Sequence, residues 1–172
     1  MQNARQSIRI GNRLFTGRPL ILAPMEDITD PPFRKLCREL GADWVYTEFI
    51  SADGLIRDAV KSIQKLDISQ EERPVSIQLF GASIPAMVDA AKAAARVGPD
   101  FVDINFGCPV RKVASKGAGS GMMNDAPKMI EMTRQIVRAV DVPVTVKTRL
   151  GYDQSSKNIV DIAEGLQDCG IA

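Results

Sequence analysis

The stretches "GADWVYTEF" (residues 41–49) and "GPDFVDINF" (residues 98–106) share one pattern. Each begins with a glycine, reaches an aspartate two residues later and continues as a short apolar run. Glycine is typical of a helix end, and a short run rich in aromatic and β-branched residues is typical of a strand buried on both faces. The repeat therefore indicates successive helix-to-strand units, which favour a parallel sheet with right-handed crossovers.

The rest of the chain extends this alternation. The predicted strands are "LILAPM" (20–25), "WVYTEF" (44–49), "VSIQLF" (75–80), "FVDINF" (101–106) and "VTVKTR" (144–149). The predicted helices span residues 31–40, 84–98, 125–140 and 156–170. Phe33, Leu36, Cys37 and Leu40 fall on one face of the first helix, and Asp125 is the predicted N-cap of the third.

Five units, with "CGIA" (169–172) as the start of a sixth strand, are somewhat over half of a TIM-type (β/α)8 barrel. A complete barrel of that kind typically needs about 250 residues. An open doubly wound sheet is the alternative, because it can be complete at 172 residues. The chain contains no GxGxxG or Walker loop that would favour this alternative.

Composition places the chain among ordinary globular domains, with 45% hydrophobic residues, 25% charged residues and a net charge of +1. The N-terminal region has no apolar stretch long enough for a signal peptide or a membrane span. Three cysteines without metal-ligand spacing predict free thiols in a reducing, cytoplasmic setting, with no metal and no membrane association. Cys37 and Cys169 are interpreted as small buried residues of helices. The chain has no histidine, so a general acid or base must be Cys, Asp, Glu, Lys or Tyr.

Polar side chains gather where the predicted strands end. They are Glu26 with its neighbour Met25 at the end of the first strand, Glu48 closing the second, Gln78 late in the third, Asn105 and Cys108 at the end of the fourth, and Lys147 and Arg149 at the end of the fifth. In a parallel barrel the carboxyl ends of the strands carry the active site, because the strand-to-helix loops meet there. Each residue alone has an ordinary structural explanation, but agreement among five strands favours a shared site.

Cys108 is the most informative of these residues. Gly107 and Pro109 hold it in a sharp loop beyond the strand, which does not suit a buried structural thiol. Arg111, Lys112 and Lys116 follow it closely. Their charges would either activate the thiol or contact a phosphate backbone. The glycine-rich stretch "KGAGSG" (116–121) permits close approach of a ligand but is equally typical of a flexible connector.

Together these motifs resemble the tRNA-dihydrouridine synthases, flavoenzymes that reduce particular uridines in tRNA. The resemblance rests on "LAPMEDITDPPFRKLCRELGAD" (22–43), "YTEFISADGL" (46–55), "VSIQLFGA" (75–82), "DINFGCPVRKVASKGAGSG" (103–121) and "VPVTVKTRLGYD" (142–153). It covers the chain from about residue 20 to the last residue, and the block around Asn105, Cys108 and Lys112 is its most specific part.

The resemblance implies a barrel that binds FMN at its carboxyl-terminal mouth. By position, Pro24, Met25 and Glu26 would lie along the isoalloxazine ring, and Gln78 would hydrogen-bond the polar edge of the ring. Lys147 would lie near the N1/O2 side, where a positive charge stabilises the anionic reduced flavin. FMN would be reduced by a nicotinamide dinucleotide, NADPH or NADH.

The resemblance also assigns a role to Cys108. The flavin delivers hydride to C6 of the uracil, and the thiol supplies the proton that C5 gains on the opposite face. The target uridine must leave its stack to reach the flavin. The residues expected to contact the tRNA substrate are Asn105, Arg111, Lys112, Lys116 and Arg149, with Asn105 helping to hold the uracil.

Two departures from the family pattern and two alternatives complete the expectations. Asp27 stands where the family often has a glycine. Residues 1–172 would form only the N-terminal part of the barrel, without the later barrel units and the helical RNA-binding domain, so we expect the chain alone to be inactive. The alternatives are an FMN-dependent reductase or dehydrogenase of a free pyrimidine, and a non-catalytic truncated barrel whose exposed strand edge promotes association.

Overall fold

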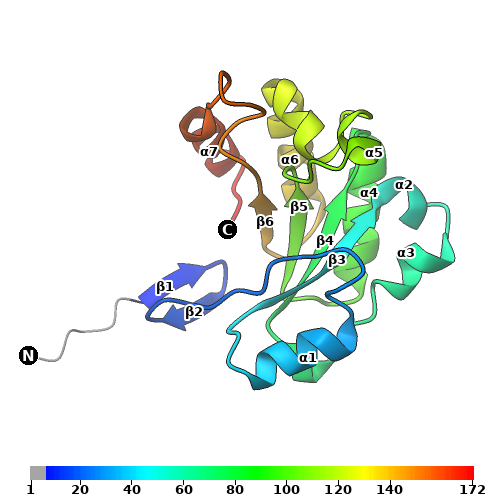
Figure 1. Cartoon of the computed structure of the whole chain (residues 1–172), viewed down its shortest axis with the longest axis vertical. Helices are drawn as coiled ribbons and strands as arrows, with labels where there is room; N and C mark the ends of the chain where they lie inside the picture. Colours follow the sequence, from blue (N-terminus) through cyan, green and yellow to red (C-terminus); the bar gives the residue numbers. More distant parts are fainter. Residues whose placement is uncertain (1–6) are drawn as a thin grey trace, which may run out of the picture.

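A computed structural model describes residues 7–172 as a curved parallel sheet with helices around its outside (Figure 1). Residues 1–6, which belong to the predicted domain of residues 1–172, lie outside the described residues. The strands are β1 (Ser7–Ile10), β2 (Arg13–Thr16), β3 (Val45–Ser51), β4 (Val75–Phe80), β5 (Phe101–Asn105) and β6 (Val144–Lys147). The helices are α1 (Pro31–Glu39), α2 (Ala52–Leu55), α3 (Val60–Gln64), α4 (Ile84–Arg96), α5 (Arg111–Ala114), α6 (Ala126–Ala139) and α7 (Ile159–Gln167). Short 3-10 turns span Gln70–Glu72 and Gly119–Asn124.

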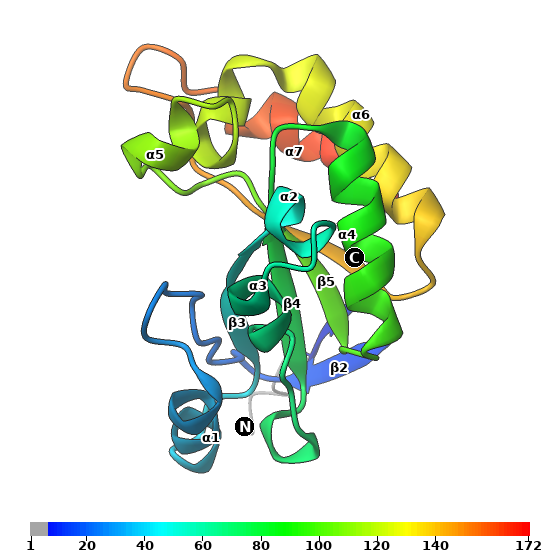
Figure 2. The ribbon, with the colours of Figure 1, turned by 90° about the vertical axis from the view of Figure 1, so that its right-hand side faces the viewer.

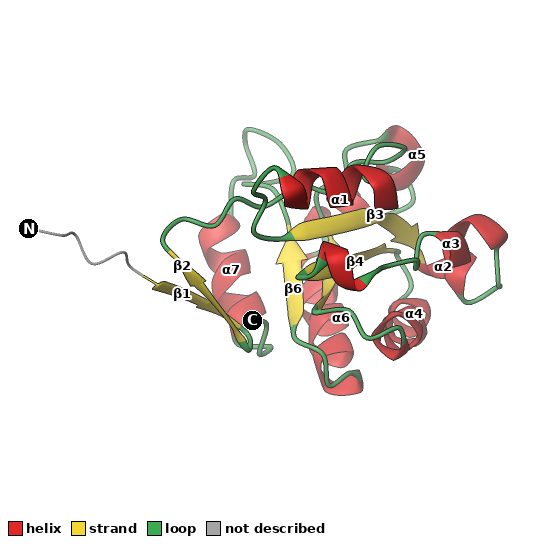
Figure 3. Ribbon diagram, turned by 90° about the horizontal axis from the view of Figure 1, so that it is seen from below, coloured by secondary structure: helices red, strands yellow, loops and turns green. Residues whose placement is uncertain are grey.

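The four-stranded sheet has the order β3-β4-β5-β6, with every pair parallel. Neighbours in sequence are therefore neighbours in the sheet, and the helices lie around the outside of the strands when viewed from below (Figure 3). A doubly wound sheet reverses its strand order at a switch point and is covered by helices on both faces. The observed order excludes that alternative and is the order of a barrel.

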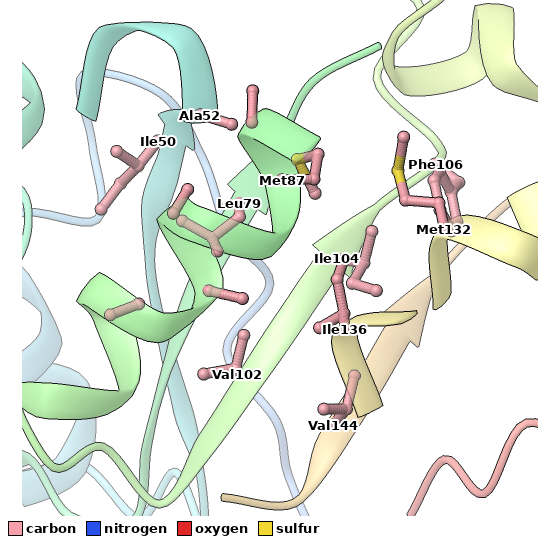
Figure 4. Close-up of a cluster of buried hydrophobic side chains, with 14 of the residues drawn as sticks. Ile50, Ala52, Leu79, Met87, Val102, Ile104, Phe106, Met132, Ile136 and Val144 are labelled. Carbon is pink, nitrogen blue, oxygen red and sulfur yellow. The ribbon is translucent and has the colours of Figure 1, made fainter. Parts of the chain in front are cut away.

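The main hydrophobic core lies between the outer face of the sheet and helices α4 and α6 (Figures 2 and 4). Ile77, Leu79, Val102, Ile104 and Val144 point outward from the strands and are almost completely buried. They pack against Met87 and the alanines of α4 and against Met129, Met132 and Ile136 of α6. Strands apolar on this face need helical cover, which the alanine-rich α4 gives at close range.

The inner face of the sheet is closed near its amino-terminal end by aromatic rings. The antiparallel β1–β2 hairpin brings Phe15 onto Trp44, with ring centroids 5.9 Å apart. Trp44 also stacks on Phe101 at 4.3 Å, and its indole nitrogen donates a hydrogen bond to Ser76. Buried Asp100, just before β5, forms ion pairs with Arg13 of the hairpin and with Arg73. The hairpin was not predicted. It anchors the amino-terminal end of the sheet, opposite the carboxyl end at which the predicted site residues lie.

Two expectations about the beginning of the chain are wrong. Residues 20–25 do not form a regular strand: only an isolated parallel bridge joins Ile21 to Trp44 beside β3. The predicted apolar face of α1 is largely exposed, since Leu36 and Leu40 are 48% and 77% exposed. The buried side chain of α1 is instead Arg34, which pairs with buried Glu72 at 2.6 Å.

Several local predictions are confirmed. Asp125 caps α6 by accepting a hydrogen bond from the amide of Lys128, and two prolines occupy the first turn of α1. Ala172 donates its amide to Val144 of β6, so the chain runs beside β6 as a sixth strand would begin. Cys169 is buried, whereas Cys37 is half-buried.

Among residues 7–172 no helix is long and apolar enough to cross a membrane.

Candidate functional site

A hydrogen-bonded network lies on the inner face of the sheet, at its centre. The carboxylate of Asp103 in β5 accepts from the amide nitrogen of Gln78 in β4 at 2.6 Å and from the hydroxyl of Thr145 in β6 at 2.6 Å. Register places Asp103 between these two residues, so all three side chains leave the same face. A carboxylate can only accept, and it therefore fixes which end of the Gln78 amide faces it.

The network continues from Gln78 to the Cys108 loop through Asn105. The Gln78 side-chain oxygen accepts from the Asn105 amide at 2.9 Å. This leaves the Asn105 oxygen to accept from the backbone amides of Gly107 at 3.0 Å and Cys108 at 2.9 Å. The buried carboxylate of Asp103 thus orients two amide side chains in turn, and the second of them holds the backbone of the Cys108 loop.

Cys108 is held from other directions as well. Its carbonyl oxygen accepts from the amide of Ser120 at 2.9 Å, and the guanidinium of Arg149 donates to the carbonyl of Gly107 at 3.1 Å. Gly119 has a φ of +54°, and a Cβ there would come within 2.7 Å of the Cys108 carbonyl oxygen. The glycine-rich stretch is therefore a close backbone approach to the cysteine loop rather than a flexible connector.

The thiol of Cys108 itself is largely enclosed, with 9% of the residue exposed. It packs with Val113 and Ala118, and partly buried Phe49 and Phe80 lie against this cluster. The sequence predicts that this sharp loop does not hold a buried thiol, and the burial of Cys108 contradicts that prediction.

Burial perturbs the titration of the network. Desolvation raises the pKa of Asp103 from 3.8 to about 6, against the opposing effects of the Thr145 and Gln78 hydrogen bonds and the charge of Lys147. Desolvation also raises the pKa of Tyr46, and the nearby charge of Asp103 adds to this increase. Ionised Asp103 is therefore costly at neutral pH, and Lys147 is the cation that offsets part of this cost.

Lys147 is the last residue of β6, and Arg149 follows it two residues later. Lys147 is the register partner of Asn105 and is exposed, so its ammonium group lies on the inner face beside the network. Within the described part of the chain, Lys147 forms no ion pair, whereas Arg149 is engaged with the cysteine loop. Lys147 is the positive charge of this region that is free to meet a ligand.

The loop after residue 23 brings Pro24, Met25 and Glu26 to the same end of the sheet. Pro24 and Met25 are half-buried, and Glu26 is exposed and pairs with Lys65. Asp27 has a φ of +58°, the left-handed conformation that favours glycine, and its amide donates to Glu48 at 2.8 Å. The carboxylates of Glu26, Asp27 and Glu48 lie within 4.8 Å of one another, but Lys65 also pairs with Glu48 at 3.4 Å and neutralises much of their charge.

A cavity of about 590 Å³ opens at the carboxyl ends of β3 and β4, between α2 and α3 on one side and the 110–118 segment on the other. We call it the Phe49–Phe80 cavity. Its lining includes Glu26, Phe49, Phe80, Lys61, Lys112 and Lys116. Arg111 is exposed at the start of α5 and does not line it. The predicted site residues thus fall into two neighbouring groups, with Gln78, Asn105, Lys147 and Arg149 around the inner face and Glu26, Lys112 and Lys116 around the cavity.

Sequence reasoning missed Asp103 and Lys65. The role of Asp103 could have been predicted, because an acidic residue in the middle of the apolar run "FVDINF" needs buried hydrogen-bond partners. The role of Lys65 could not have been predicted. It lies in a segment for which no helix or strand was predicted, and only the fold brings it to Glu26.

Comparison with known proteins agrees with this architecture. The chain matches the dihydrouridine synthase (Dus) family model over residues 21–172. It is 41% identical over 164 residues to tRNA-dihydrouridine synthase B of Pseudomonas aeruginosa, covering 95% of this chain and 49% of the relative. It is 42% identical over 153 residues to the protein of that name from Shewanella oneidensis, covering 89% of this chain and 48% of the relative.

The fold also matches a solved structure. The whole chain superposes on 68% of a variant of NCR from Zymomonas mobilis with a TM-score of 0.62 and 16% identity, a likeness of fold alone that supports the partial TIM barrel. The chain spans about half the length of the curated relatives that it matches. From its match to the family model over most of its length, this chain belongs to the dihydrouridine synthase family.

Proposed function

We propose that this chain forms the N-terminal part of the catalytic barrel of a tRNA-dihydrouridine synthase, an oxidoreductase that reduces the C5–C6 double bond of uridines in tRNA. The observation that carries the proposal is the network of Asp103, Gln78 and Asn105, which holds the Cys108 loop at the carboxyl end of β5. Such a chain of oriented amides has a clear purpose if Cys108 must be presented in one defined position to a substrate. The names of the relatives support tRNA as the substrate.

The residues at this end of the sheet suit a flavin in most respects. Lys147 offers an unpaired positive charge on the inner face, and Met25 and Pro24 offer half-buried apolar surface. The fit at Gln78 is partial, because its side chain has no exposed surface and one of its two amide hydrogens is already donated to Asp103. A direct contact between Gln78 and the ring would use the other hydrogen. Glu26 would contribute to flavin binding through the half-buried Lys65 with which it pairs, rather than as a free carboxylate.

When bound, FMN reduced by NADPH or NADH supplies the hydride that C6 of the uracil accepts. Cys108 holds the proton that C5 must gain. Its loop is fixed by hydrogen bonds in which the Asn105 side-chain oxygen accepts and the Ser120 amide and Arg149 guanidinium donate. Asn105 retains one amide hydrogen, which is suited to a carbonyl oxygen of the uracil. Lys112 and Lys116, both exposed, supply positive charge for the tRNA backbone.

Titration of the chain with FMN, followed by quenching of flavin fluorescence, tests the flavin part of the proposal. Saturable quenching that is weakened by Lys147→Ala and unchanged by Lys157→Ala is the expected result. Lys157 is an exposed lysine to which no role in flavin binding is assigned, and it serves as the control. Quenching that is equally weakened by both substitutions would contradict a specific role for Lys147.

A further inference from the structure

The floor of the Phe49–Phe80 cavity is aromatic. Phe49 and Phe80 come from the carboxyl ends of β3 and β4, and their rings meet edge to face with centroids 5.2 Å apart and an interplanar angle of 79°. Both side chains are half-buried and line the cavity. An edge-to-face pair leaves one ring face open to a flat partner, which can add an offset stack to it.

The rim of the cavity is positively charged. Lys61, Lys112 and Lys116 line it and form no ion pair with any residue in the described part of the chain. The fourth lining lysine, Lys65, is neutralised by Glu26 and Glu48. Asp53 is the remaining acidic residue of the lining, so the rim carries a net positive charge.

We propose that the Phe49–Phe80 cavity binds a single nucleotide, with its base against Phe49 and Phe80 and its phosphate near Lys112 and Lys116. Aromatic surface for a base combined with lysines for a backbone is the chemistry by which proteins bind single-stranded nucleic acid. The volume of about 590 Å³ lies within the range of small-molecule sites.

The position of the cavity indicates which nucleotide it would take. Val113 and Ala118 line the cavity and also pack against Cys108, so the cavity and the thiol lie on either side of a shared wall. Resting on the proposed function, we infer that the occupant is a nucleotide next to the target uridine in the tRNA. Holding the neighbour in this cavity would keep the strand unstacked while the target lies at Cys108.

Titration of the flavin-free chain with uridine 5′-monophosphate, followed by NMR chemical shifts, tests the proposal. Phe49→Leu keeps an apolar side chain against the cluster that contains Cys108 but removes the ring. It is expected to weaken binding at least about fivefold, the loss of about 1 kcal/mol of stacking. Lys112→Ala is expected to weaken binding of both the nucleotide and inorganic phosphate. Lys92→Ala, an exposed lysine of α4 away from the cavity, is the control and should change neither.

Three results would overturn the inference. They are the absence of saturable nucleotide binding, unchanged binding in Phe49→Leu, and tighter binding of NADPH than of a uridine dinucleotide, which would identify the cavity as a reductant site. The test contains no flavin, so it is separate from the proposed function. Nucleotide binding without FMN binding would support the cavity as a nucleotide site and would contradict the proposal that this chain binds a flavin.

Discussion

Replacing Asp103 by asparagine is expected to stabilise the chain at neutral pH. The carboxylate is 1% exposed, and it accepts hydrogen bonds from Gln78 and Thr145. Asparagine has nearly the same shape, its oxygen can accept from Gln78, and its amide can donate to the Thr145 hydroxyl, which accepts as well as donates. The substitution therefore keeps the network while it removes a buried negative charge.

The pKa of Asp103 sets the size of the expected gain in stability. It is raised from 3.8 to about 6 by burial, so the folded chain binds this proton more tightly than the unfolded chain does. The free energy of unfolding contributed by this group consequently falls as the pH rises from about 4 to about 6 and is constant outside that window. At about 1.4 kcal/mol per pH unit, the ionised carboxylate costs up to about 3 kcal/mol at pH 7, and Asp103→Asn removes this cost.

Urea unfolding of both proteins, followed by far-UV circular dichroism between pH 4 and pH 7, measures the effect. The other carboxyl groups titrate in both proteins, so the difference in free energy of unfolding isolates Asp103. The difference should be small at pH 4 and should favour Asp103→Asn increasingly up to pH 6. A difference that is the same at pH 4 and pH 7 would refute the reasoning.

Three further substitutions test other parts of the structure. Asn105→Ala removes the acceptor of two loop amides and is expected to cost about 2–3 kcal/mol of stability. It should also speed labelling of Cys108 by a thiol reagent, and an unchanged labelling rate would contradict the role of Asn105 in holding the loop. Arg34→Ala leaves the buried carboxylate of Glu72 without its cation and is expected to destabilise the chain by about 3–5 kcal/mol in thermal or urea unfolding, so a loss below 1 kcal/mol would argue against the buried pair. Asp27→Gly relieves a left-handed backbone conformation and should be more stable than Asp27→Ala by about 1 kcal/mol, whereas equal stability of the two would show that this conformation is not strained.

The regular part of the fold follows from local patterns. Runs such as "VSIQLF" became β4 because both faces of the strand are buried, and the alanine-rich segment became α4 because it packs closely on the sheet. Residues 20–25 look like the other runs but pair only through one bridge at Ile21. An apolar run becomes a regular strand only where a neighbour supplies a full ladder of hydrogen bonds, and the sequence of the run does not contain that information.

The candidate site was predictable to the extent that it depends on strand ends. Gln78, Asn105 and Lys147 lie on one face because register places them there, as alternation along parallel strands predicts. The cavity was not predictable, because it is formed by α2, α3 and a loop that are joined only in the folded chain. The use of the Asn105 amide by the cysteine loop is also a consequence of the turn geometry rather than of residue type.

The most direct test joins this chain to the C-terminal half of tRNA-dihydrouridine synthase B from Pseudomonas aeruginosa, of which it matches 49%. Dihydrouridine formed in an unmodified tRNA transcript, with FMN and NADPH supplied, is then measured for the chimera, for Cys108→Ala and for Cys169→Ala, the control substitution of a buried cysteine in the last turn after α7. We expect the chimera and Cys169→Ala to reduce the tRNA and Cys108→Ala to reduce it far more slowly. Full activity of Cys108→Ala, or reduction of free uracil in place of tRNA, would contradict this expectation.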